Sequence, residues 1–260
     1  MSCEILIDLI FEKFNFQSFP NEYKKVLMIA MKKINEELGE DLLSITLGGS
    51  GGKNKIIQGW SDLDIYVIVK KHNINKFKNI QKELECLPIH IGLTIYTIEE
   101  VENNFVDYKT KVMIYEKNNF NVNPTLYGNE YFQNVTLEDI LKNDLLNYPQ
   151  VLQMFRRMYV EVLNGNKKID KTYVKKMLVL VKCILSCNNI FTYGYDEVYE
   201  KFMNISNNIN IGSLQSAIMD LESNNDYILN LSSQIIEYTE QNNVFYNIDN
   251  FKNKKLRIVL

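Results

Sequence analysis

The chain has 260 residues, of which 46% are apolar and 23% are charged, and its formal net charge is −3. This composition is typical of folded globular proteins, and the length corresponds to one large domain or two smaller ones. The slight negative charge argues against a protein that coats nucleic acid, and charges interrupt every apolar run before it reaches the roughly 18 residues of a membrane span.

Helix and strand patterns alternate along the first half of the chain. Apolar residues recur with a helical period over 21–38, and Gly39 follows as a stop signal. The remaining predicted elements are strands at 42–47, 63–69 and 90–97, and helices at 75–86, 98–104 and 108–117. This order predicts an α+β unit built on a mixed sheet.

The second half of the chain carries almost no strand signals. An apolar run opens at Leu137, and Thr136 is its candidate N-cap. Helical periodicity covers 150–163, 171–187, 195–204, 212–222 and 224–240, with joints rich in asparagine and glycine between these segments. We therefore predict an all-α bundle after the first unit. We expect the first domain to span residues 1–130 and the second to span residues 131–260.

The cellular compartment is predicted from the amino-terminal segment and the cysteines. Glu4 and Asp8 interrupt the first apolar stretch, which lacks a basic leader and is predicted to be an amphipathic helix. The four cysteines, Cys3, Cys86, Cys183 and Cys187, form no C-x-x-C pair and are interpreted as reduced thiols. We therefore expect a cytoplasmic protein.

Residues 47–69, LGGSGGKNKIIQGWSDLDIYVIV, hold the most informative pattern. A glycine-rich turn with Gly49 and Ser50 closes one predicted strand, and Asp62 and Asp64 open the next. Alternate residues of a strand share a face, so the two carboxylates are expected to project together and to repel unless a cation lies between them. Oxygen ligands favour Mg²⁺, and a glycine turn can bind phosphate through backbone N–H groups. Either feature alone is commonly a solvated loop or strand end, but together they indicate phosphoryl or nucleotidyl transfer.

This segment resembles the DNA polymerase β-like nucleotidyltransferase superfamily. The shared pattern is an apolar residue and Gly-Ser, then eleven residues, then Asp-apolar-Asp, here Asp62-Leu63-Asp64. Residues 59–67, GWSDLDIYV, are most similar to the small bacterial nucleotidyltransferases that act on aminoglycosides and lincosamides. The resemblance implies that Gly49 and Ser50 hold the phosphates of a nucleotide and that Asp62 and Asp64 bind Mg²⁺. It further implies transfer of a nucleoside monophosphate to a hydroxyl of a small molecule, with release of pyrophosphate. AMP from ATP is the favoured group, and another nucleoside triphosphate is the alternative.

One expected feature of that superfamily is missing. A third carboxylate is usual on a later strand, and the corresponding position here is Gly92. His90, two residues earlier on the same predicted face, is a candidate general base, although a strand-end histidine without a catalytic role is an alternative. Asp107 and Glu99 are other candidates to approach the site.

The resemblance also implies a role for lysines of the helical half. Related antibiotic enzymes use a bundle lysine near the phosphates, so Lys176 and Lys182 are candidate nucleotide-binding residues. The expected partner is a small, cationic acceptor, with neither a membrane nor a nucleic acid involved, and the protein is expected to be a monomer or a homodimer.

Two alternatives remain open from the sequence. The acceptor could be a protein or an RNA, as in toxin and defence nucleotidyltransferases, although the negative charge argues against RNA. The chain could also be a nucleotide-binding pseudoenzyme, because Gly92 stands where an acid is expected.

Overall fold

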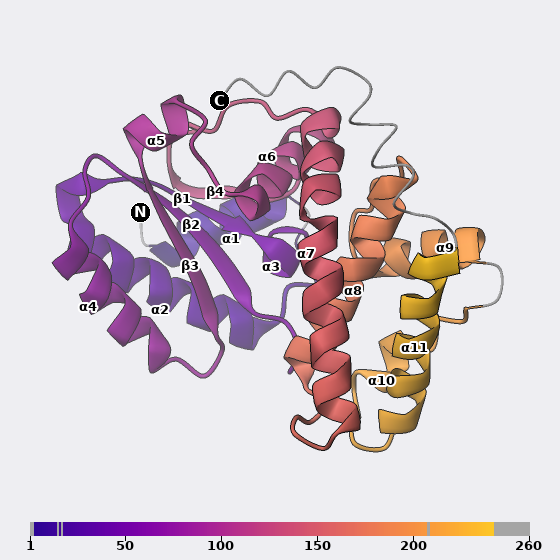
Figure 1. Cartoon of the computed structure of the whole chain (residues 1–260). Coiled ribbons are helices and arrows are strands. Elements are labelled where there is room, and N and C mark those ends of the chain that lie inside the picture. Colours follow the sequence, from indigo (N-terminus) through magenta and orange to yellow (C-terminus); the bar gives the residue numbers. More distant parts are fainter. Residues whose placement is uncertain (1–2, 15, 17, 207–208, 242–260) are drawn as a thin grey trace. The chain divides into compact units, whose positions relative to one another are not determined.

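The computed structural model describes residues 3–14, 16, 18–206 and 209–241. The chain separates into two compact units, Met1–Thr136 and Leu137–Leu260 (Figure 1). The first contains a mixed sheet with helices, and the described elements of the second are all helices. The predicted fold class, an α+β core followed by a helical region, is therefore confirmed. None of the described helices combines the length and the apolar character needed to cross a membrane.

Within the described residues, four strands form one sheet in the order β3-β2-β1-β4. They are β1 (Leu42–Gly48), β2 (Leu63–Val69), β3 (Ile91–Thr97) and β4 (Thr125–Gly128). Strand β1 is antiparallel to β2 and β4, whereas β2 and β3 run parallel, as a helical crossover between them allows. The sequence placed Asp62 and His90 on strands. In the structure Asp62 directly precedes β2, and His90 directly precedes β3.

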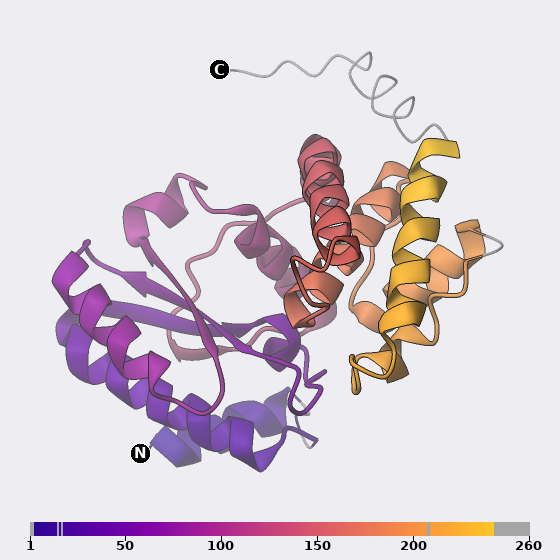
Figure 2. The same ribbon diagram turned by 60° about the horizontal axis from the view of Figure 1, so that its bottom comes forward.

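Helices α1, α2 and α4 bury one face of the sheet in the main core. They are α1 (Cys3–Lys13), α2 (Asn21–Leu38) and α4 (Ile74–Glu85), with the short 3₁₀ turn η1 (Gly39–Asp41) after α2. Alternate residues of β2 contribute to this core, which gathers Leu63, Ile65, Val67, Leu27, Ile34, Ile80 and Leu84. Figure 2 shows α2 and α4 side by side along the sheet.

Helices α5 (Ile98–Glu102) and α6 (Tyr108–Phe120) lie on the opposite face. A smaller buried cluster joins Ile68, Tyr96 and Val101 there. The Tyr96 hydroxyl lies 3.0 Å from the Thr110 hydroxyl and accepts the N–H of Asp107 at 3.0 Å. Because side chains alternate along β2, this second face is the one that carries Asp64.

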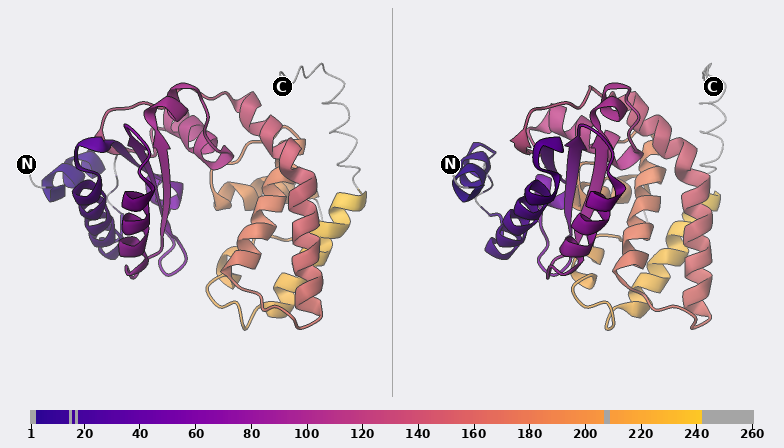
Figure 3. Two further views of the ribbon diagram at one scale, coloured as in Figure 1. Left: turned by 60° about the vertical axis from the view of Figure 1, so that its left-hand side comes forward. Right: turned by 90° about the vertical axis from the view of Figure 1, so that its left-hand side faces the viewer.

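The second unit contains α7 (Leu137–Leu163), α8 (Lys171–Cys187), α9 (Tyr195–Ser206), α10 (Leu214–Ala217) and α11 (Asn225–Gln241), seen in Figure 3. Helix α7 begins at Leu137, directly after the candidate cap Thr136, and continues through Pro149 into the segment predicted from residue 150. Proline normally breaks a helix because it lacks an N–H and crowds the preceding turn. Here Tyr148 and Leu152, on either side of it, are both buried, and their packing keeps one helix.

Candidate active site

Asp64 is the second residue of β2, a strand with neighbours on both sides. Its backbone pairs with Gly48 of β1 on one side and with Gly92 of β3 on the other. Its side chain is only 17% exposed. The carboxylate is therefore fixed by two neighbouring strands and still reaches solvent, as a metal ligand in an open site must.

Two glycines leave the space that the Asp64 carboxylate fills. A Cβ on Gly92 would lie 2.6 Å from Asp64 Oδ1, and a Cβ on Gly49 would overlap Oδ2. Gly49 also has φ +61°, a left-handed conformation that side chains with a Cβ rarely adopt. A side chain at position 92 would therefore require the Asp64 carboxylate to move from its present position.

Lys109, in the first turn of α6, is a site residue that the sequence reasoning did not find. Its Nζ lies 2.6 Å from Asp64 Oδ1, while the lysine side chain is 61% exposed. The two residues are 45 positions apart in the sequence. A possible signal is Asp107, which caps α6 by accepting the N–H of Thr110 at 2.8 Å and so fixes where the helix begins.

The glycine turn forms a single helical turn, α3 (Gly49–Gly52), after β1. Its end is anchored where the N–H of Asn123 donates to Gly52 O at 2.7 Å. The first N–H groups of a helical turn have no carbonyl partner inside that turn. Gly49 and Ser50 thus present backbone donors next to Asp64, which suits a phosphate group near a carboxylate-bound cation.

A buried ion pair holds the glycine turn against α6. Lys53 Nζ lies 3.0 Å from Glu116 Oε1, and the two side chains are 15% and 4% exposed. Asn123 Nδ2 donates to the same carboxylate at 3.4 Å. Lys53 therefore acts as a support for the turn.

Replacing Lys53 by Met should lower the free energy of unfolding by about 3 kcal/mol, because it breaks a pair whose acid stays buried. Urea denaturation measures this change. The control is Lys55→Met, in the same turn but exposed, for which a change within about 0.5 kcal/mol is expected. Equal effects of the two substitutions would contradict the supporting role of Lys53.

Asp62 and His90 lie side by side at the end of the sheet near Asp64. The N–H of Leu63 donates to His90 O at 3.0 Å, which extends the pairing of β2 and β3 by one bond. Alternation puts His90 on the face of Gly92. The imidazole is exposed and Asp62 is half-buried, so both side chains reach solvent.

Tyr66 lies two residues beyond Asp64 on the same face and is 2% exposed. Burial raises the pKa of Tyr66, and the negative charges of Asp64, Asp107 and Glu116 raise it further. The hydroxyl therefore stays protonated at neutral pH and acts as a neutral group beneath the site.

The donor set suits a single hard cation. Among the described residues, no group of three or more His, Cys, Asp or Glu side chains is gathered for metal binding. Asp62 and Asp64 offer carboxylate oxygens, the ligands that Mg²⁺ prefers, and Mg²⁺ commonly completes its shell with water and substrate phosphate. The two residues therefore fit a magnesium ion that arrives with a nucleotide.

The other candidates lie elsewhere. Lys176 and Lys182 are half-buried on α8 in the second unit. Lys182 Nζ lies 5.7 Å from the centre of the Phe191 ring, and a nucleotide-binding role for either lysine stays a prediction. Trp60 is 6% exposed and packs in the turn before Asp62. Glu99 is exposed in α5, and the Asp107 side chain caps α6.

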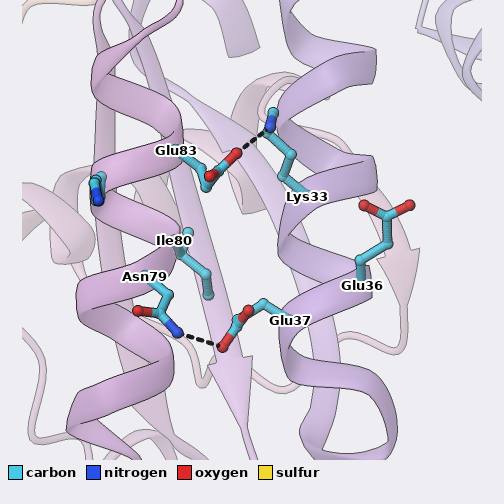
Figure 4. Close-up of a pocket in the computed structure, with 7 residues that line it drawn as sticks. Lys33, Glu36, Glu37, Asn79, Ile80 and Glu83 are labelled. Carbon is cyan, nitrogen blue, oxygen red and sulfur yellow. Dashed lines mark hydrogen bonds and ion pairs between the residues drawn. The ribbon is translucent and has the colours of Figure 1, made fainter.

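A pocket on the surface between α2 and α4 is separate from this site (Figure 4). Lys33 pairs with Glu83 across it, and Asn79 Nδ2 donates to Glu37 Oε1 at 3.1 Å. These helices cover the face of the sheet opposite Asp64. The polar side chains that line this pocket join the two helices to each other, and we assign it no role in phosphate chemistry.

Comparison with known proteins agrees with this geometry. Residues 29–119 match the family model described as a nucleotidyltransferase domain. A solved structure of spectinomycin adenyltransferase AAD(9) from Enterococcus faecialis, with ATP and spectinomycin, is similar in fold, with a TM-score of 0.52 and 14% identity. The match covers 85% of this chain and 98% of that one. No sequence among the curated proteins matches the chain.

Proposed function

We propose that this nucleotidyltransferase moves AMP from ATP to a hydroxyl of a small, cationic molecule of the aminoglycoside type. The observation that carries the proposal is the Asp64 carboxylate set against the glycine turn at Gly49, within a domain of the nucleotidyltransferase family. The fold shared with an adenyltransferase whose structure holds ATP and an antibiotic supports this choice of nucleotide and acceptor.

The reaction exchanges one phosphorus–oxygen bond for another. The acceptor oxygen bonds to the α-phosphorus, and the bond from that phosphorus to the α,β-bridging oxygen breaks. Pyrophosphate leaves with the electron pair of that bond, and the acceptor hydroxyl loses its proton. In this reading His90 accepts the proton, because its exposed imidazole lies at the same end and on the same face of the sheet as Gly92.

The chain supplies positioning and charge. Asp62 and Asp64 would hold Mg²⁺, which neutralises negative charge on the phosphates during transfer. The N–H groups of Gly49 and Ser50 would donate to the phosphate oxygens. We also propose Lys176 and Lys182 as nucleotide-binding residues. We assign residues 1–130 to nucleotide and metal binding and 131–260 to the acceptor.

We place the protein in the cytoplasm, as a monomer or a homodimer. Cys183 and Cys187 are buried and free. Burial raises the pKa of both thiols, to about 12 for Cys187, so neither ionises at neutral pH. Such unreactive core thiols suit a reducing compartment.

The test is pyrophosphate release with each of the four ribonucleoside triphosphates and a panel of aminoglycosides, spectinomycin and lincosamides. We expect release with ATP and at least one antibiotic, together with a mass gain of one AMP on that antibiotic. Labelling of a protein or an RNA from a cell extract, with no antibiotic modified, would overturn the small-molecule acceptor. Nucleotide binding without any transfer would overturn the proposal.

A further inference from the structure

We propose that Lys109 takes the place of a second metal ion, so that the site works with one divalent cation and one ammonium group. This inference rests on the proposed function and concerns the same site. Its basis is the ion pair between Lys109 Nζ and Asp64 Oδ1, at 2.6 Å.

The residues around Asp64 Oδ1 supply an ammonium group and no ligand for a second metal. A second ion shared by two carboxylates requires a further ligand beside Oδ1, as in two-metal sites, where the ions lie roughly 4 Å apart. The residue paired with Asp64 on that side is Gly92, which has no side chain to act as that ligand, whereas Lys109 Nζ lies 2.6 Å from Oδ1. No other carboxylate completes a group of three around Asp64 among the described residues.

The position of Lys109 lets it serve both as a counter-ion and as a substrate contact. It stands in the first turn of α6, whose start is fixed by the Asp107 cap. Its side chain is 61% exposed, whereas Asp64 is 17% exposed, so the ammonium approaches the carboxylate from the solvent side. A triphosphate that enters from the solvent side would meet this ammonium group, which would put a positive charge beside the reacting phosphate.

The role of Lys109 is to balance negative charge on Asp64 and on the phosphate, while the hydroxyl proton goes to another group. Since it shares Asp64 with the metal, its charge should oppose metal binding and favour transfer. A residue that serves only the fold would not shift these two quantities in opposite directions.

The test measures Mn²⁺ binding by electron paramagnetic resonance, with and without a non-hydrolysable ATP analogue, alongside turnover. The wild-type protein should bind one Mn²⁺ per complex with the analogue. Lys109→Met should bind Mn²⁺ alone about fivefold more tightly, because the competing charge is gone, and should transfer nucleotide about 100-fold more slowly. Lys109→Arg, which keeps the charge, should recover most of the rate.

The matched control is Lys111→Met, because Lys111 lies about 200° around α6 from Lys109 and should leave both quantities unchanged. Two Mn²⁺ ions per wild-type complex, or unchanged metal affinity and rate in Lys109→Met, would overturn the role of Lys109 and leave the proposed function standing. Failure of every variant and the wild type to bind the Mn²⁺–analogue complex would overturn both.

Discussion

Asp64→Asn should reduce nucleotidyl transfer about 10³-fold and leave the protein folded. The substitution keeps the shape of the side chain and removes the charge that holds the cation. Loss of about 4 kcal/mol of transition-state stabilisation corresponds to that factor, since each 1.4 kcal/mol is tenfold. Pyrophosphate release under saturating ATP measures the rate, and circular dichroism checks the fold.

The control for this substitution is Asp41→Asn. Asp41 lies in η1, before β1, at the far end of that strand from the glycine turn. It also pairs with a lysine, Lys76, at 3.0 Å, and its side chain is 22% exposed, close to the value for Asp64. Asp41→Asn should keep the wild-type rate. Wild-type turnover by Asp64→Asn would show that the metal assignment is wrong.

Gly49→Ala should reduce transfer about 100-fold, because a new Cβ at this position must displace the Asp64 carboxylate. Displacements near 1 Å in an active site can cost about that factor. The left-handed backbone at Gly49, with φ +61°, adds a strain of about 1 kcal/mol for any residue with a Cβ. Steady-state rates and urea denaturation measure the two effects separately.

Gly165→Ala separates the effect of backbone strain from the effect of the contact between the new Cβ and Asp64. Gly165 has φ +70°, and a Cβ there would meet no atom within 4 Å. This variant should lose about 1 kcal/mol of stability through strain and keep the wild-type rate. A normal rate in Gly49→Ala would mean that Asp64 can move without loss of function, which contradicts a fixed metal ligand.

The elements that determine the fold class could be predicted from local patterns. The stripe of apolar residues over 21–38 and the β-branched run at 63–69 correspond to α2 and β2, because periodicity reports which face of an element is buried. The continuity of α7 through Pro149 could not be predicted in this way. Whether Pro149 ends a helix depends on the buried neighbours Tyr148 and Leu152, which belong to tertiary packing.

The candidate site also has a part that the sequence predicted and a part that only the structure shows. Gly49, Ser50, Asp62 and Asp64 are close in sequence, so their spacing alone indicated a phosphate turn and a cation. The resemblance also predicted an acid where the chain has Gly92, and the structure shows that the Asp64 carboxylate lies in the space beside this glycine.

Local sequence features were enough to predict the type of chemistry, because a strand, a glycine turn and a pair of alternating carboxylates all lie within a short stretch of the chain. Only the tertiary structure brought Lys109 and Glu116 to them. Parallel pairing of β2 with β3 and the packing of α6 on the sheet place Lys109 on Asp64 and Glu116 on Lys53. Contacts between residues 45 and 63 positions apart leave no periodic trace in a sequence, because they depend on how whole elements pack.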